Sequence, residues 1–157
     1  INIVTELQER GFDTHLHIVG PISDNKYGNS VRKAAMKQDG IFLEGRVDRN
    51  TLVDLIGNHK YGLHGKENEH FGMAVAELVA GGTLPIVHNS GGQREIVNQK
   101  NELLYNSHTQ AVDKIAHILN KEDKGHDLLK YLPDIEDKFD RKRFKQTIRQ
   151  EVEHMLN

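Results

Sequence analysis

Cysteine is absent from the 157-residue sequence, which excludes a disulfide framework and thiolate metal sites and is compatible with a reducing compartment. An excess of basic charge is also absent: 21 Lys and Arg residues face 23 Asp and Glu residues, for a formal net charge of −2. This balance gives no sign of a nucleic-acid-binding stripe, so we expect no nucleic-acid partner. No signal peptide and no apolar run of membrane-spanning length is present, and we expect a cytoplasmic location.

The first residue is Ile1 rather than Met, and the sequence enters at once a helical pattern from Val4 to Arg10, which Gly11 ends. We therefore expect the chain to be a fragment of a longer protein. Its length suits one domain with a substantial core, here 1–157, with a C-terminal helical segment over 136–157.

Short apolar segments alternate with helical patterns along the chain. Strands are predicted at 15–19, 41–47, 61–64, 84–88 and 103–105, and helices at 25–38, after the N-cap Asp48, at 73–80, 94–97, 109–120 and 140–156, with 121–127 as a charged linker. This alternation predicts an α/β fold with a Rossmann-like parallel sheet flanked by helices. Ligands of such sheets lie beyond the carboxyl ends of the strands.

The stretch from Glu69 to Glu77 combines an acidic loop with a helix that is apolar on every side except at Glu77. Such a helix is expected to be buried, and its carboxylate then needs a partner: a basic side chain, backbone or hydroxyl donors, or a ligand. The backbone N–H groups at the helix start, near Phe71 and Gly72, favour an anion. The stretch therefore predicts an anion site with an acceptor for hydroxyl groups about two turns deeper.

The spacing of Glu69 and Glu77, with Phe71 and Gly72 between them and the Asn89-Ser90-Gly91-Gly92 turn after them, resembles a known family. It is similar to the C-terminal, donor-binding half of retaining GT-B glycosyltransferases of the family 4 type, also called glycosyl transferases group 1, which carry two Glu residues separated by seven others. The longer match from Gly62 to Gly92 resembles the eukaryotic α-1,2-mannosyltransferases that extend lipid-linked oligosaccharides.

The resemblance implies transfer of a hexose, with mannose favoured, from a GDP- or UDP-linked sugar to a lipid-linked or glycan acceptor with retention of configuration. Glu69 would be the catalytic residue, either stabilising positive charge at the anomeric carbon or orienting the hexose. Glu77 would accept hydrogen bonds from the ribose hydroxyls of the donor.

The remaining donor contacts are also implied by the resemblance. The backbone of Phe71, Gly72 and Met73 would meet the diphosphate, which the missing Cβ of Gly72 lets approach closely. Val47 and Arg49 would lie beside the nucleotide base.

The family's C-terminal half normally opens with a strand and a loop whose Arg and Lys grip the diphosphate, and this chain begins after that loop. The expected sheet therefore lacks its first strand, and the acceptor-binding N-terminal domain is a missing partner. The acceptor lipid would place the full-length protein at a membrane surface. We expect the fragment alone to be inactive, because positioning needs both walls of the cleft.

Ten histidines raise the question of a metal site. His15 and His17 alternate on a predicted strand and share a face, but no third ligand has a suitable spacing. The resemblance implies no essential metal, so we expect packing or surface histidines and no cofactor besides the nucleotide-sugar substrate.

Simpler interpretations stay open for each feature. Glu77 could form a helix–helix ion pair, Glu69 could be an exposed loop acid beside Glu67, and the 89–92 turn could merely connect a strand to a helix. For the whole protein, the alternatives are a sugar-nucleotide 2-epimerase of the same architecture and a non-catalytic nucleotide-sugar sensor or scaffold.

Overall fold

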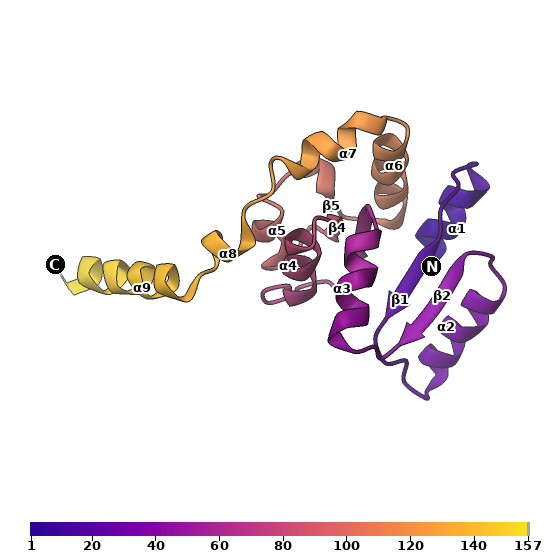
Figure 1. Cartoon of the computed structure of the whole chain (residues 1–157), viewed down its shortest axis with the longest axis horizontal. Helices are drawn as coiled ribbons and strands as arrows, with labels where there is room; N and C mark the ends of the chain where they lie inside the picture. Colours follow the sequence, from indigo (N-terminus) through magenta and orange to yellow (C-terminus); the bar gives the residue numbers. More distant parts are fainter. Residues whose placement is uncertain (157) are drawn as a thin grey trace.

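The predicted alternation of strands and helices is confirmed by a computed structural model, which describes residues 1–156 (Figure 1). The strands are β1 (Leu16–Val19), β2 (Ile41–Gly45), β3 (Tyr61–His64), β4 (Leu84–His88) and β5 (Leu104–Tyr105). The helices are α1 (Asn2–Glu9), α2 (Lys26–Met36), α3 (Arg49–Asn58), α4 (Met73–Ala80), α5 (Gln93–Ile96), α6 (His108–Leu119), α7 (Glu122–Leu129), α8 (Ile135–Lys138) and α9 (Arg141–Leu156), with a 3₁₀ turn at Asn101–Leu103.

Every strand pair is parallel, but the pairing differs from a single sheet. Within residues 1–156, β1 and β2 form one sheet, and β3, β4 and β5 form another in that order. β1 and β3 are therefore each hydrogen-bonded to a strand on one side only in the described part of the chain. The fold is α/β with parallel sheets flanked by helices, as expected from strands that alternate with helices.

The larger sheet carries most of the core. β4 lies at its centre, and Leu84, Ile86 and Val87 are almost completely buried. Side chains from α4, α5 and α6 pack in the same cluster, among them Val75, Ile96, Val112 and Ile118. Burial of each such aliphatic side chain contributes roughly 1.5–3 kcal/mol, so this half forms a rigid base for the loops at its strand ends.

The β1–β2 half is more thinly packed. Its core cluster contains Val4, Ala35 and Ile41 from α1, α2 and β2, whereas α3 has no buried residue among those described. Figure 1 shows α3 between the two sheets.

Two predictions about helices are wrong. In α4 only Val75 and Ala76 are buried, and Met73 is 69% exposed, because β3, β4, α5 and α8 leave part of the helix in solvent. The predicted charged linker at 121–127 is mostly helical and forms the larger part of α7. Leu128 packs into the core and stabilises this helix despite its polar composition.

In the C-terminal segment the helix predicted at 140–156 is confirmed as α9. The segment 136–157 is nevertheless not one continuous helix, because Phe139 and Asp140 separate α8 from α9, and residue 157 lies outside the described residues. α9 projects from the rest of the molecule in Figure 1, and its apolar residues Phe144, Ile148 and Val152 are exposed. No helix among residues 1–156 has both the length and the apolar character needed to cross a bilayer.

Candidate functional site

Glu69 lies in the loop between β3 and α4, where it is held by two hydrogen bonds. Its Oε2 accepts from Lys66 Nζ at 2.9 Å, and its Oε1 accepts from the backbone N–H of His70 at 3.0 Å. The hydrogen bond from Lys66 holds the pKa of the Glu69 carboxyl below its usual value. The side chain is only 18% exposed, so Glu69 is a fixed, ionised acid rather than the exposed loop acid of the simpler interpretation.

His64 is the closest ring to this carboxylate. Its Nε2 lies 3.8 Å from Glu69 Oε2 and is buried without a hydrogen-bond partner among the described residues. Burial lowers the pKa of His64, and the charge of Lys66 lowers it further, while Glu69 opposes both. The imidazole is therefore kept neutral near pH 7, and the carboxylate keeps its negative charge.

The turn after β4 holds the Glu69 loop in place. The N–H of Gly92 donates to the carbonyl oxygen of Glu69 at 2.8 Å, and the N–H of Asn68 donates to Ser90 Oγ at 2.8 Å. A Cβ at Gly91 would collide with the Glu69 carbonyl oxygen. The glycines are thus required by the close approach of two backbones, and the turn positions the acidic loop.

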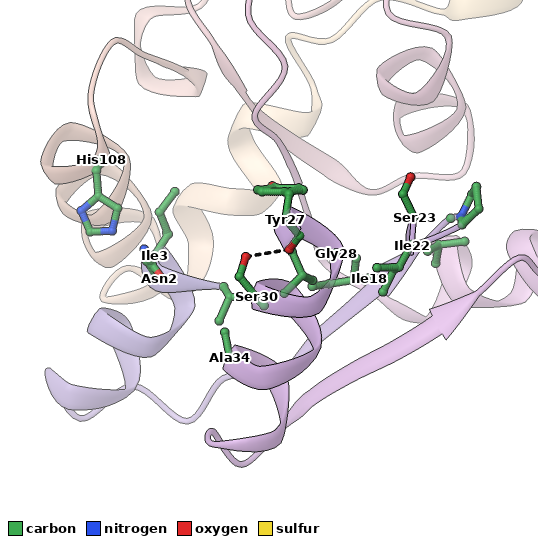
Figure 2. Close-up of a pocket in the computed structure, with 15 residues that line it drawn as sticks. Asn2, Ile3, Ile18, Ile22, Ser23, Tyr27, Gly28, Ser30, Ala34 and His108 are labelled. Atoms are coloured by element: carbon green, nitrogen blue, oxygen red, sulfur yellow. Dashed lines mark hydrogen bonds between the residues drawn. The ribbon is translucent and has the colours of Figure 1, made fainter. Parts of the chain in front are cut away.

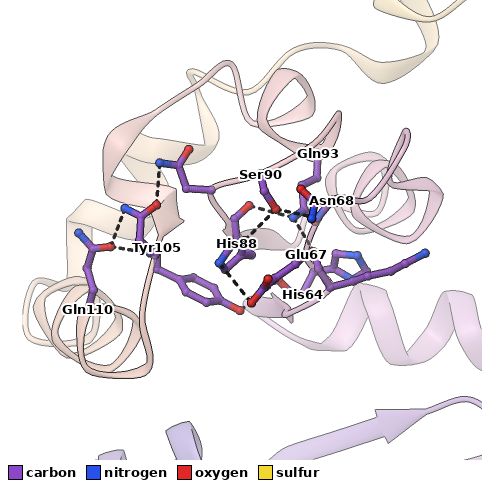
Figure 3. A network of polar contacts seen from close by, with 11 residues as sticks. His64, Glu67, Asn68, His88, Ser90, Gln93, Tyr105 and Gln110 are labelled. Atoms are coloured by element: carbon purple, nitrogen blue, oxygen red, sulfur yellow. Dashed lines mark hydrogen bonds and ion pairs between the residues drawn. The ribbon is translucent and has the colours of Figure 1, made fainter.

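Gln93 joins the same loop to the sheet. Its amide Nε2 donates to the carbonyl oxygens of Lys66 at 2.9 Å and His88 at 2.8 Å, and the side chain is fully buried (Figure 3). The Tyr105 hydroxyl donates to the His64 carbonyl oxygen at 3.2 Å, which links β5 to the end of β3. The carboxyl ends of β3, β4 and β5 are therefore connected into one polar network around the loop.

The sequence predicts an anion site at the start of α4. Gly72 precedes the helix with φ 98°, and no side chain among the described residues caps the first turn. A Cβ on Gly72 would lie 3.2 Å from Gln93 Cβ and from Ile96 Cδ1, so glycine also permits close packing on α5. Phe71 packs edge-on against Phe139, with ring centroids 5.0 Å apart.

Glu77 and Arg49 are brought together across α4 and α3. Arg49 Nη1 lies 2.6 Å from Glu77 Oε1, with side chains that are 70% and 33% exposed. Asp48 fixes Arg49 at the start of α3, because its carboxylate accepts from the N–H groups of Asn50 and Thr51. This contact is the helix–helix ion pair that the sequence analysis gives as the simpler interpretation of Glu77. An exposed ion pair contributes only about 0–1 kcal/mol to stability, so a ligand could replace it at little cost.

A separate cavity of about 590 Å³ lies between α1, α2 and the carboxyl end of β1 (Figure 2). It is lined mainly by apolar and hydroxyl side chains, including Ile18, Ile22, Tyr27 and Ser30. None of the predicted site residues is among the described residues that line it.

Comparison with known proteins gives the family. Residues 1–133 match the family model described as Glycosyl transferases group 1. The chain belongs to this family. The predicted family is thus confirmed, while the roles of Glu69 and Glu77 stay predictions.

Three relatives of the chain share one description, "GDP-Man:Man(3)GlcNAc(2)-PP-Dol alpha-1,2-mannosyltransferase". The protein from Dictyostelium discoideum is 25% identical over 158 residues, covering 96% of this chain and 31% of the relative. The Mus musculus protein is 34% identical over 88 residues, covering 53% of this chain and 18% of the relative. The Candida albicans protein is 45% identical over 53 residues, covering 32% of this chain and 9% of the relative.

The structure adds to the candidate site three residues that the sequence analysis did not predict as site residues. His64, Lys66 and Gln93 surround the Glu69 loop. His64 and Lys66 fall within the longer match from Gly62 to Gly92, and Gln93 lies just outside it. A buried glutamine directly after two glycines gives no local signal, because its role depends on two carbonyl groups from distant segments. Among the described residues, His15, His17 and His59 also form the one group of three side chains close enough to hold a metal ion.

Proposed function

We propose that this chain is the donor-binding part of a retaining mannosyltransferase that moves mannose from GDP-mannose to a lipid-linked glycan. The observation that carries the proposal is the convergence of the β3–α4 loop and the turn after β4 on an ionised, immobilised Glu69. In α/β proteins this edge of the sheet is where ligands bind. The family match and the relatives' shared description supply the donor and acceptor classes.

In this proposal the donor lies along α4. Its diphosphate meets the backbone N–H groups of Phe71, Gly72 and Met73 at the uncapped helix start, where the helix dipole favours negative charge. The ribose hydroxyls donate to Glu77, replacing its exposed contact with Arg49. Arg49 and the neighbouring Val47 are then placed beside the base.

Glu69 faces the transferred sugar. A carboxylate kept ionised by Lys66 stabilises positive charge that develops at the anomeric carbon, or orients the hexose through its hydroxyls. No metal or cofactor is assigned to this chemistry. The second wall of the cleft is supplied by an acceptor-binding domain and by a loop whose Arg and Lys grip the diphosphate, in a longer protein that works at the cytoplasmic surface of a membrane.

The relatives' description as transferases favours this function over a 2-epimerase or a sensor. The test replaces the matched third of the Dictyostelium relative with residues 1–157 of this chain, and measures mannose transfer from GDP-mannose to a lipid-linked acceptor. We expect the hybrid to transfer mannose and Glu69→Gln to lower kcat by at least ~100-fold, in the range of lost electrostatic stabilisation.

Glu67→Gln is the matched control, because Glu67 is an acid in the same loop with a 72% exposed side chain. We expect this variant to keep nearly full activity. An active hybrid in which Glu69→Gln and Glu67→Gln behave alike would contradict the role of Glu69, and product formation without any acceptor would favour the epimerase.

A further inference from the structure

A cluster of three histidines lies away from the Glu69 loop, at the start of β1 and the end of α3. His15, His17 and His59 each bring one ring nitrogen within 4.8 Å of the other two. The ring centroids of His17 and His59 are 4.7 Å apart, and those of His15 and His59 are 5.4 Å apart. The sequence offers only the first two as a pair, and the fold supplies the third.

The outer nitrogens of two rings are already engaged. His17 Nδ1 lies 2.6 Å from Glu44 Oε1, and His59 Nδ1 lies 2.5 Å from the carbonyl oxygen of Leu55. Both oxygens are acceptors, so each Nδ1 carries the proton and donates, which leaves Nε2 of both rings with a free lone pair. A carboxylate or backbone carbonyl on one ring nitrogen is the usual support of a histidine that binds metal through the other.

The free nitrogen of His59 is the second observation that points to a ligand. His59 Nε2 is buried and has no hydrogen-bond partner among the described residues. A buried polar atom without a partner is costly, and a metal ion would satisfy it. His15 is exposed and can turn toward the same point, since its ring makes only edge contacts with its neighbours.

We propose that His15, His17 and His59 form a binding site for a divalent transition metal, with Zn²⁺ as the ion that suits it best. Three imidazole nitrogens and one open position match the preferred tetrahedral coordination of Zn²⁺. Tetrahedral ligands at Zn–N distances of about 2.1 Å lie roughly 3.4 Å apart, so small side-chain rotations close the site around the ion. The bound ion would tie the end of α3 to β1, in the half of the molecule where α3 has no buried residue.

The test is a titration of the 157-residue chain with Zn²⁺ against a chromogenic chelator, and with Co²⁺ followed by its visible ligand-field absorption. We expect one tight site, a tetrahedral Co²⁺ spectrum and a higher Tm with Zn²⁺. His59→Ala and His15→Ala should each weaken binding by ~100-fold or more, and His15 is exposed, so its removal leaves the fold intact. Glu44→Gln should weaken it by about 10–100-fold, as loss of a carboxylate behind a ligand does.

His117→Ala is the matched control, because His117 is an exposed histidine on α6 outside the cluster. We expect it to bind Zn²⁺ as the unaltered chain does, and circular dichroism should be the same for all variants. Binding that is equally strong in His15→Ala, His59→Ala and His117→Ala would overturn the site, as would an octahedral Co²⁺ spectrum. None of these results depends on mannose transfer, so the test is separate from that of the proposed function.

Discussion

Gln93 is one of two fully buried polar side chains among the described residues, the other being Thr83. Its single amide group satisfies two backbone carbonyls, one in the loop before Glu69 and one at the end of β4. A fully buried side chain therefore helps to hold the loop that carries Glu69.

Gln93→Met tests this connection, since methionine keeps the length of the side chain and removes both donors. Leaving the carbonyl groups of Lys66 and His88 unpaired should lower the free energy of unfolding by about 1–3 kcal/mol. Gln150→Met, in exposed α9, is the matched control and should change it by less than ~0.5 kcal/mol. Urea unfolding of the two variants measures both, and equal midpoints would contradict the role of Gln93.

His64 makes the stability depend on pH. Its pKa in the folded chain lies below the ordinary value of 6.5, chiefly through burial, so the unfolded chain binds the proton first as the pH falls. The stability that neutral His64 contributes is thus fully present above pH 6.5, and it is lost as the pH falls from there through the lower pKa of the folded chain. The lowered pKa of Glu69 acts in a lower window, where stability is lost as the pH falls through the carboxyl range.

We expect the chain to lose more stability between about pH 7.5 and pH 5.5 than its His64→Gln variant does, because glutamine does not titrate. Urea unfolding at both pH values gives the comparison. The expectation fails if chain and variant lose the same amount, which would assign the dependence to other histidines.

At the scale of elements, the turn after β4 depends on glycine for a reason that the sequence shows only in part. Two adjacent glycines predict a turn, but not that the backbone of Glu69 and His70 lies against them. That contact joins segments far apart in the chain, so no local pattern could indicate it.

Gly92→Ala should displace the Glu69 loop, because the new Cβ would collide with the His70 carbonyl oxygen. We expect a loss of about 1–3 kcal/mol, comparable to other strained core changes. Gly57→Ala is the opposite control: a Cβ there meets nothing within 4 Å in helix α3, and alanine should stabilise by about 0.5–1 kcal/mol. Thermal unfolding of both variants decides, and a stabilising Gly92→Ala would be incompatible with the close approach.

The helices show where sequence patterns succeed and fail. Caps were predictable, because the Asp48 carboxylate accepts from the first turn of α3 as its position indicates. The burial of α4 was not, since a uniformly apolar composition does not say which side its neighbours cover. α7 was not predicted because its polar composition favours a linker, and the burial of Leu128 in the core is a long-range contact.

α9 adds little to the stability of the described part of the chain, since its side chains from Arg141 to Met155 are exposed. Removing residues 141–157 should leave the urea midpoint of the rest nearly unchanged, within ~0.5 kcal/mol. A cooperative loss of stability on removal would show that α9 packs against the body after all.

At the scale of the whole molecule, the parallel pairing of the strands could be predicted, but the division into two sheets could not. Alternating strands and helices predict parallel pairing. Whether β1 and β3 pair with each other depends on contacts between distant segments, and in the structure they belong to separate sheets. The same long-range geometry brings Arg49 to Glu77 and His59 to His15 and His17, pairs that are distant in the sequence. The sequence therefore indicated which residue types matter, but not which of these residues lie in contact in the folded chain.

The most direct measurement is the affinity of GDP for the chain, by NMR titration of backbone amides, compared between Glu77→Gln and Glu67→Gln. If the Glu77 carboxylate accepts the ribose hydroxyls, Glu77→Gln should weaken binding by about 10-fold or more, because hydrogen bonds to a charged group are worth roughly 1.5–3 kcal/mol. Glu67→Gln should leave the affinity unchanged, and the amides of Gly72 and Met73 should shift in both variants. Equal affinities in the two variants, or shifts confined to residues away from α4, would contradict the donor site proposed here.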